Sequence, residues 1–311
     1  MKYFIGIDGG GTKTKAVLVD ENLNIINEGI GGPSNFLVFD INDVTNSILE
    51  LLSNLTNEVN VSLNDIQSIL IGTAGAGRRD DAQRLENSVF KAAKENNLHI
   101  NDFRVESDAR IALEGAFAGK PGSILIAGTG SIMFGKDLDG NIHRVGGFGR
   151  ILGDEGSGFH IGQAGLSAVA KSFDGRNNGT LLTQLIKDKF NINDSVQLIN
   201  EVYKNNFDIP KVAPLVIEAA EKNDNICKDI LNSEIDELLE HISAMKKTIN
   251  EDVLSISLIG GTITTNNYYA NLFQSRIKEI ANVKVKVKVK DAQLSPHMGA
   301  ALMAKSLFSN S

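Results

Sequence analysis

Tryptophan is absent from this chain of 311 residues, and cysteine occurs once, as Cys227. A single cysteine allows no internal disulfide and no metal site built from several thiolates. Cys227 lies in a helical pattern, which favours a plain core thiol. The sequence therefore points away from disulfide-stabilised and thiolate-metal proteins.

Long apolar runs and an excess of basic residues are also missing. No run approaches the ~20 residues that a membrane-spanning helix needs, and the start shows no signal-peptide pattern. Acidic residues outnumber basic ones by 38 to 31, and the net charge of −7 argues against nucleic acid or an anionic membrane as the main partner. We therefore expect a cytoplasmic protein without nucleic-acid or membrane partners.

Glycine, in contrast, is concentrated in two hairpins about 120 residues apart that share one sequence pattern. In each, an apolar strand ends in a glycine- and hydroxyl-rich turn: Asp8-Gly9-Gly10-Gly11-Thr12 in the first, and Gly128-Thr129-Gly130-Ser131 in the second. Such a turn exposes backbone N–H groups without side-chain cover, which suits phosphate oxygens. Two such loops facing each other would clamp one polyphosphate, which indicates an enzyme that uses a nucleotide.

The order of hairpin, helices and glycine-ended strand occurs twice. The apolar strand 66–71 leads into Gly72, and strand 254–259 leads into Gly260-Gly261-Thr262. Alternating strands and helices predict an α/β fold with a mainly parallel sheet. The repetition predicts a duplicated fold with a cleft between the halves. Residues 283–290 alternate valine and lysine, which predicts a further strand with a solvated lysine face.

These motifs resemble, in order and over essentially the whole chain, the superfamily of sugar kinases, heat-shock chaperones and actin. Its two phosphate motifs are matched by Asp8 to Thr12 and by Ala127 to Ser131, and its adenosine motif by Gly260-Gly261-Thr262. Within it, the chain resembles the N-acetylglucosamine kinases, a branch of the BadF/BadG/BcrA/BcrD ATPase type. The segments that carry this closer resemblance are Pro33-Ser34-Asn35, Ser107-Asp108-Ala109, Gly128-Thr129-Gly130-Ser131 and Gly147 to Ser157.

The resemblance implies a duplicated actin-like ATPase (ribonuclease H-like) fold, with two lobes and a central nucleotide and sugar cleft. The lobes are expected at residues 1–118, joined by the C-terminal helix 291–311, and at residues 119–290. It also implies ATP and Mg²⁺ as cofactors, a small-molecule sugar as the other partner, and a homodimer, which is common in the family. ATP and phosphate binding would fall to Asp8, Gly10, Gly11, Thr12, Lys13, Gly128, Thr129, Gly130, Gly261 and Thr262.

Two aspartates have a structural interpretation beside the functional one. Asp8 would orient Mg²⁺ through water beside the ATP phosphates, or it is a turn aspartate that caps its own glycine loop. Asp108 ends a strand and opens a helix, so the residues alone fit a helix N-cap equally well. The matching aspartate of the family is the catalytic base, which would take the proton of the sugar hydroxyl.

The family's sugar ligands match Asn35 and Asp154, with Phe36, Ser131, Asp108 and the segment Gly147-Phe148-Gly149 in the same pocket. As structural alternatives, Asn35 is a loop residue and Asp154 an N-cap. The animal enzymes carry tryptophan in both the Asn35 loop and the Gly147 loop, whereas this chain has Phe148 at the second position.

The implied activity is phosphorylation of the 6-hydroxyl of an amino sugar, with N-acetylglucosamine first and glucosamine or N-acetylmuramic acid as alternatives. An activator ATPase of a 2-hydroxyacyl-CoA dehydratase is a further alternative. Such activators hold an iron–sulfur cluster with two cysteines from each subunit, because thiolates are its usual ligands. One cysteine does not supply them.

Overall fold

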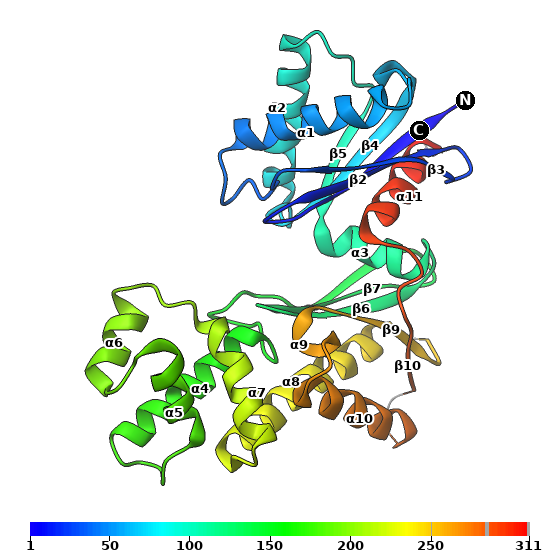
Figure 1. Ribbon diagram of the computed structural model, residues 1–311. Helices are drawn as coiled ribbons and strands as arrows, with labels where there is room; N and C mark the ends of the chain where they lie inside the picture. The colour runs from blue at the N-terminus through cyan, green and yellow to red at the C-terminus, as the bar shows by residue number, and fades with distance from the viewer. Residues whose placement is uncertain (250, 284–285, 310–311) are drawn as a thin grey trace. The chain divides into compact units, whose positions relative to one another are not determined.

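The computed structural model describes residues 1–249, 251–283 and 286–309. The chain forms two compact units: the first comprises residues 1–122 and 291–311, and the second comprises residues 123–290. Each unit is built on one five-stranded sheet with helices packed against it (Figure 1). The α/β class predicted from the sequence is confirmed.

The sheet of the first unit has the strand order β3-β2-β1-β4-β5. Strands β1, β2 and β3 pair antiparallel with one another in turn, whereas β4 pairs parallel with both β1 and β5. The parallel strands need helical crossovers, which explains the alternation of strands and helices in the sequence. The elements of this unit are β1 (Tyr3–Gly9), β2 (Thr14–Asp20), β3 (Ile25–Gly31), α1 (Ile41–Asn57), η1 (Leu63–Asp65), β4 (Ile66–Thr73), α2 (Arg79–Glu95), β5 (Phe103–Ser107), α3 (Asp108–Phe117) and α11 (Pro296–Ser309).

Alternate side chains of the central strands point to opposite faces of this sheet, and helices cover both faces. On one face, Ile5 and Ile7 of β1 join a core formed with helices α1 and α2. On the other face, Phe4 of β1 and Leu70 of β4 pack with Ile111 of α3 and with helix α11. Segments from the two ends of the chain thereby share one core.

Glycine allows α11 to approach β1 closely. A Cβ atom on Gly6 would lie 2.1 Å from the carbonyl oxygen of His297 and 2.2 Å from the nitrogen of Ala301. Helix α3 is approached in the same way, since a Cβ on Gly299 would lie 2.2 Å from the carbonyl oxygen of Ile111. Any side chain at these positions would push the helix away from its neighbours.

The second unit repeats the topology of the first, with the strand order β8-β7-β6-β9-β10. Strand β9 is parallel to β6 and β10, and β7 is antiparallel to β8. Its elements are β6 (Gly122–Ala127), β7 (Ser131–Lys136), β8 (Ile142–Gly146), α4 (Gly158–Phe173), α5 (Leu181–Phe190), α6 (Ser195–Tyr203), η2 (Ile209–Val212), α7 (Ala213–Glu221), α8 (Asn225–Thr248), β9 (Leu254–Ile259), α9 (Gly261–Thr264), α10 (Tyr268–Val283) and β10 (Val287–Val289).

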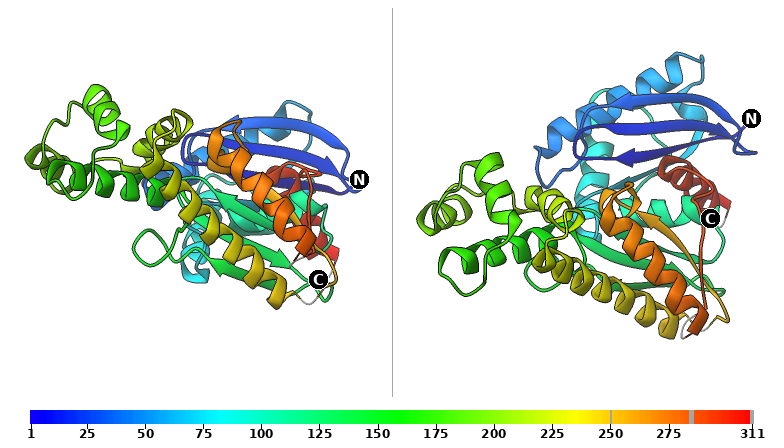
Figure 2. Two further views of the ribbon diagram at one scale, coloured as in Figure 1. Left: turned by 90° about the horizontal axis from the view of Figure 1, so that it is seen from below. Right: turned by 60° about the horizontal axis from the view of Figure 1, so that its bottom comes forward.

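Helices α4 to α8 lie between β8 and β9, where the first unit has α1. They form one large core with strands β6, β7 and β9 and with α10, which runs beside α8 (Figure 2). Cys227 of α8 is buried in this core, and burial raises the pKa of its thiol to about 12. The predicted core thiol is confirmed, and it is unreactive near neutral pH.

The predicted strand over residues 283–290 is partly wrong. Helix α10 continues to Val283, and the strand β10 begins at Val287, where it pairs in parallel with β9. Residues 284 and 285 lie outside the described part of the chain. Phe273 and Ile277 of this helix belong to the core, and tertiary packing of this kind can outweigh local strand propensity.

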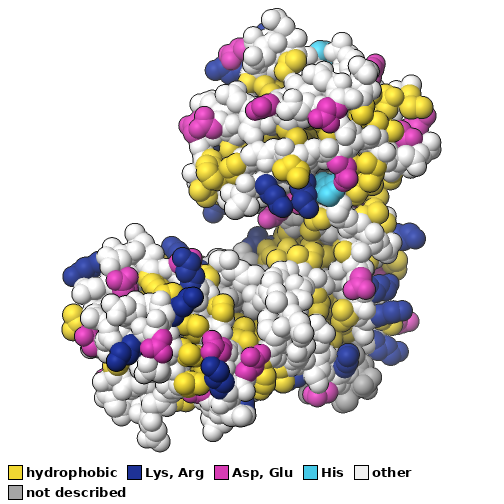
Figure 3. All heavy atoms as spheres, viewed as in Figure 1, with side chains coloured by type: hydrophobic (Ala, Val, Ile, Leu, Met, Phe, Trp, Pro, Cys, Tyr) yellow, Lys and Arg dark blue, Asp and Glu magenta, His cyan; other side chains and the backbone are white. Residues whose placement is uncertain are grey.

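No described helix is both long and apolar enough to cross a membrane. On the face of each unit that Figure 3 shows, acidic and basic side chains both occur. This mixture agrees with the modest net charge of −7.

Candidate functional site

The first glycine loop joins β1 to β2 and is fixed through its backbone. The N–H of Gly10 donates to the carbonyl of Lys13 at 3.1 Å, and the carbonyl of Gly10 accepts from the N–H of Ser34 at 3.0 Å. Gly11, Thr12 and Lys13 are exposed. The loop therefore keeps free surface for a ligand while it is tied to the segment that contains Asn35.

Asn35 stands at the start of that second loop. Its side-chain oxygen accepts from the N–H of Leu37 at 3.1 Å, which leaves its NH₂ group to donate elsewhere. The side chain of Phe36 is 5% exposed and belongs to the core beneath. Phe36 thus anchors this loop, and its ring does not face solvent.

The structure brings Asp8 and Asp108 into electrostatic contact within the first unit. Burial is the main cause of a raised pKa at Asp8, where the charge of His297 lowers the pKa and that of Asp108 raises it. In the described residues, the Asp8 carboxylate makes no hydrogen bond to its glycine loop, so the loop-capping interpretation is wrong. Burial and the neighbouring charge of Asp108 both disfavour the ionised form of the Asp8 carboxyl group.

Asp108 is the first residue of α3 and not its cap. Ser107 is the N-cap, because its side chain accepts from the N–H of Arg110 at 3.2 Å. The Asp108 carboxylate accepts only a local bond from the N–H of Ala109 at 2.8 Å among the described residues. The N-cap interpretation of Asp108 is therefore wrong, and the carboxylate keeps acceptor capacity for a ligand.

The second glycine loop, residues 128–131, is held by two helices of its own unit. The carbonyl of Gly128 accepts from the N–H of Gly158 at 2.8 Å and from the hydroxyl of Thr262 at 3.1 Å. The carbonyl of Thr129 accepts from the N–H of Phe159 at 3.1 Å. The predicted phosphate and adenosine motifs of this unit thus meet at Gly128.

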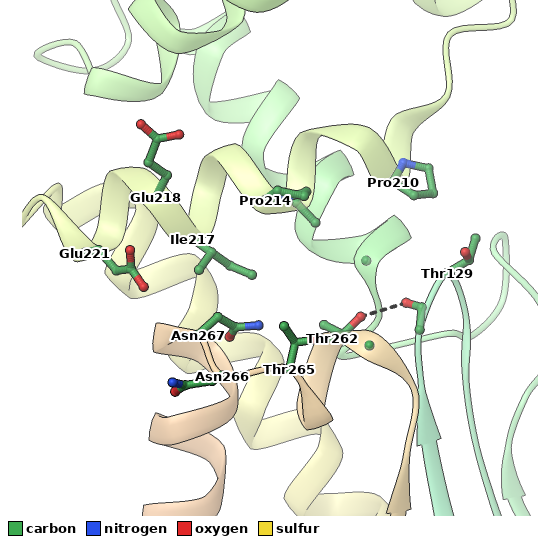
Figure 4. A pocket seen from close by; sticks show the side chains of 14 residues that line it. Thr129, Pro210, Pro214, Ile217, Glu218, Glu221, Thr262, Thr265, Asn266 and Asn267 are labelled. Atoms are coloured by element: carbon green, nitrogen blue, oxygen red, sulfur yellow. Dashed lines mark hydrogen bonds between the residues drawn. The ribbon is translucent and has the colours of Figure 1, made fainter.

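A pocket of about 720 Å³, here called the Thr262 pocket, opens beside this junction. In Figure 4, the side chains of Pro210, Pro214 and Ile217 stand on one side of it, with Thr262, Thr265 and the two asparagines opposite. Its volume is within the range of small-molecule sites. The lining residues are Gly128, Thr129, Gly158, Pro210, Ala213, Pro214, Ile217, Glu218, Glu221, Gly261, Thr262, Thr265, Asn266 and Asn267.

A second pocket of about 550 Å³, here called the Asp154 pocket, adjoins the first. The two share Thr129 and Pro210 in their walls. The second glycine loop therefore lies where both pockets meet. The Asp154 pocket is lined by Thr129, Arg150, Asp154, Phe159, Asn206, Phe207, Asp208, Ile209 and Pro210.

Asp154 lies against the second glycine loop. A Cβ on Gly130 would come within 2.8 Å of its Oδ2, and the N–H of Ser131 donates to its Oδ1 at 3.4 Å. Its φ of 68° is a left-handed conformation that non-glycine residues adopt at a cost, often at functional sites. Ser157, which accepts from the N–H of His160 at 3.4 Å, is the N-cap of α4. The N-cap interpretation of Asp154 is therefore also wrong.

Two side chains of the second unit hold the backbone at Gly156, in the turn that contains Asp154. Glu234 of α8 accepts from the N–H of Gly156 at 2.7 Å, and the hydroxyl of Tyr269 of α10 donates to the carbonyl of Gly156 at 3.0 Å. Burial raises the pKa values of both Glu234 and Tyr269. These two residues, which sequence reasoning missed, fix the backbone next to Asp154.

The segment Gly147 to Gly149 lines neither pocket. Gly147 and Gly149 have φ values of 70° and 80°, and the ring of Phe148 is 69% exposed with the guanidinium of Arg144 5.4 Å from its centroid. These predicted sugar ligands thus lie near the turn that contains Asp154 but outside both pockets.

Sequence reasoning also missed the apolar wall of the Thr262 pocket, formed by Pro210, Pro214 and Ile217. Two prolines were the available signal, Pro210 in the first turn of η2 and Pro214 in the first turn of α7, since proline favours the first turn of a helix. Among the described residues, no group of three or more histidine, cysteine, aspartate or glutamate side chains could hold a metal ion. Asp8 therefore stays the single predicted metal contact.

The repeated sheets with their glycine-ended strands define a protein of the duplicated actin-like class, with a pocket of small-molecule size beside the second glycine loop. The profile of the BadF/BadG/BcrA/BcrD ATPase family matches residues 5–304, and the chain belongs to this family. A crystal structure from Chromobacterium violaceum is similar with a TM-score of 0.73 and 23% identity, over 98% of this chain and 99% of that chain. The predicted fold and family are confirmed.

Two relatives match over nearly their whole length. The chain is 33% identical to the N-acetylmuramic acid/N-acetylglucosamine kinase of Clostridium acetobutylicum, over 98% of this chain and 99% of that protein. It is 30% identical to the N-acetyl-D-glucosamine kinase of Dictyostelium discoideum, over 97% of this chain and 98% of that protein.

Proposed function

We propose that this protein is an ATP-dependent sugar kinase that phosphorylates the 6-hydroxyl of N-acetylglucosamine. One observation carries the proposal: the Thr262 pocket and the Asp154 pocket meet at Thr129 and Pro210. A nucleotide in the first pocket, with its phosphates on the loop of Thr129, would direct its terminal phosphate toward an acceptor in the second. The two amino-sugar kinases that resemble the chain support the same acceptor class.

In this proposal the Thr262 pocket holds adenosine. Ile217 and the two prolines offer an apolar surface to the base, and the side chains of Asn266 and Asn267 offer donors and acceptors to polar edges. The phosphates would contact Gly128, Thr129, Gly130, Gly261 and Thr262 in the second unit. In the first unit, the phosphates would contact Asp8, Gly10, Gly11, Thr12 and Lys13.

The acceptor would be bound by an amide and a carboxylate. The NH₂ group of Asn35 has no hydrogen-bond partner among the described residues, and Asp154 keeps acceptor capacity beyond its 3.4 Å bond from Ser131. Phe36 would support Asn35 from the core. The backbone of Gly147, Phe148 and Gly149 would contact the acetamide only if this segment moves when sugar binds.

Asp108 would act as the catalytic base. As the 6-oxygen attacks the γ-phosphorus, the bond between that phosphorus and the β–γ bridging oxygen breaks and ADP leaves. The hydroxyl proton passes to the Asp108 carboxylate. Its free acceptor capacity at the start of α3 supports this role.

Asp8 would hold Mg²⁺ through a water molecule. The ion would supply positive charge beside the phosphates, and its fit rests on the like-charged neighbours Asp8 and Asp108. A cytoplasmic location, expected from the composition, and a homodimer, which rests on the family resemblance, complete the proposal. The single buried cysteine does not favour an iron–sulfur activator.

The test is a coupled ADP-release assay with N-acetylglucosamine, glucosamine, N-acetylmuramic acid, N-acetylmannosamine and glucose. We expect N-acetylglucosamine to exceed glucose and glucosamine by about tenfold or more in kcat/KM, because buried partners of the acetamide would be left unpaired. The 6-deoxy analogue should release no ADP above background. Absence of sugar-stimulated ADP release with all five sugars would refute the kinase, and preference for glucose would refute the acceptor.

A further inference from the structure

The Asp154 pocket contains an arginine that its proposed role in binding a neutral sugar does not require. Arg150 lines the pocket, and its guanidinium lies 6.0 Å from the centroid of the Phe159 ring. Within residues 1–249, 251–283 and 286–309, Arg150 forms no ion pair with a carboxylate. A guanidinium presents a planar set of donors that matches a carboxylate in two-point contact.

The acidic side chains that share the pocket are occupied by other partners. Asp208 pairs with Lys211 at 3.5 Å, and Asp154 accepts from the N–H of Ser131. If Asp154 binds sugar hydroxyls, as proposed above, its charge is engaged there. Arg150 is then the group in the pocket left to bind an anion.

The wall next to Arg150 is apolar and well supported. Phe159 is 9% exposed, and Phe207 packs edge-on against Phe190 with ring centroids 4.9 Å apart. The backbone N–H of Phe207 also donates to the carbonyl of Glu201 at 3.1 Å. The pocket thus combines a fixed aromatic surface with one cation, which suits a short substituent that carries both an alkyl group and a carboxylate.

We infer that the Asp154 pocket is an acceptor subsite for N-acylated hexosamines that carry a carboxylate substituent, and that Arg150 is its specificity-determining residue. The inference rests on the proposed kinase function. The lactyl ether of N-acetylmuramic acid has the required chemistry: its methyl group would contact the aromatic wall and its carboxylate would pair with Arg150. N-acetylglucosamine leaves the subsite to water, so both sugars are acceptors.

The experiment compares N-acetylmuramic acid, its uncharged methyl ester and N-acetylglucosamine, in the wild type and in Arg150→Gln and Arg150→Lys. Both kcat/KM and the dissociation constant without ATP are measured. We expect Arg150→Gln to lower kcat/KM for the acid by roughly ten- to a hundredfold, the range for a lost charge-assisted hydrogen bond. The ester and N-acetylglucosamine should change by less than about threefold on the same scale. Arg150→Lys should restore part of the loss, because lysine keeps the charge without the planar fork.

Two controls separate charge at the subsite from charge elsewhere. Arg176→Gln removes the same charge from an exposed pair with Asp174 in the same unit, and it should leave all three acceptors unaffected. Raising the salt concentration from about 0.05 to 0.5 M should weaken binding of the acid alone, because salt screens exposed charges.

The possible results are distinct. If Arg150→Gln lowers kcat/KM equally for all three acceptors, Arg150 acts on the phosphates or on the fold, and the inference is overturned. Phosphorylation of N-acetylglucosamine without any of N-acetylmuramic acid would overturn it too, while the kinase proposal would stand. If none of the acceptors is phosphorylated, the kinase proposal itself fails.

Discussion

The two units share one strand order but build their sites by different means. In the first unit, helices cover both faces of the sheet, and the candidate groups are side chains at strand ends and on a loop: Asp8, Asp108 and Asn35. In the second, the helices between β8 and β9 add the pocket walls beside a glycine loop. The comparison teaches that one strand order ends in glycine-rich turns in both units, whereas the two pockets need the segments that follow β8 and β9 in the second unit.

The largest expected effect tests whether the first unit supplies the catalytic base. Asp108→Asn should lower kcat by roughly 10²–10⁴-fold, the range for loss of a general base. The sugar dissociation constant should change far less, because an amide oxygen still accepts from the hydroxyl. Rapid-quench turnover and equilibrium titration measure the two quantities, and near-wild-type turnover in a folded variant would be incompatible with the role.

A second variant tests how the first unit is packed. Gly6→Ala places a methyl group against backbone atoms of His297 and Ala301, and we expect a loss of about 1–3 kcal/mol in the free energy of unfolding. Urea unfolding measures this change. Gly77→Ala is the control, because nothing lies within 4 Å of its added Cβ. Equal stability of both variants would contradict the close approach of α11 to β1.

A third variant tests whether sugar binding and nucleotide binding depend on different units. Asn35→Ala should raise the sugar KM by roughly tenfold, as expected for one lost hydrogen bond of about 1.4 kcal/mol. The KM for ATP should stay within about twofold on the same scale, because the Thr262 pocket is formed wholly by the second unit. Initial-rate kinetics with each substrate varied in turn provide the check. A parallel rise in both KM values would mean that the Asn35 loop affects the nucleotide as well.

Much of this architecture could be predicted from the sequence, because its signals are local. A buried strand followed by glycines indicates a phosphate loop at Asp8 and at Gly128, and the same pattern indicates the ends of β4 and β9. The walls at Ile217 and Pro210 could not be predicted as a pocket, because the prolines signal only that helices begin there. The wall residues come together only through tertiary packing. The strand predicted from Val283 was partly right, since β10 forms at Val287–Val289 whereas α10 continues to Val283.

The smallest expected effect concerns the electrostatic cost of the carboxylate pair in the first unit. The pKa of Asp8 is raised in the folded state, chiefly by burial, so the folded protein binds this proton more tightly than the unfolded chain does. The contribution of Asp8 to stability is thus fully present below its unfolded pKa of about 3.9, and it is lost as the pH rises through the higher folded pKa. At pH 7 the charged carboxylate destabilises the fold. Asp8→Asn should therefore raise the Tm of the ligand-free protein at pH 7, by roughly 2–4 °C for each kcal/mol relieved, and the gain should vanish near pH 3.5.

The matched control has the opposite sign. The Asp20 carboxylate accepts from the side chain and the backbone of Asn24, and these bonds lower its pKa. Its contribution to stability is present above its unfolded pKa and is lost as the pH falls through the lower folded pKa. Asp20→Asn should accordingly lower the Tm at pH 7. Scanning calorimetry of both variants between about pH 3.5 and 8 spans the window that these pKa values define. A lower Tm for Asp8→Asn at pH 7 would show that attraction to His297 outweighs burial and the charge of Asp108, and that the carboxylate at the end of β1 stabilises the first unit.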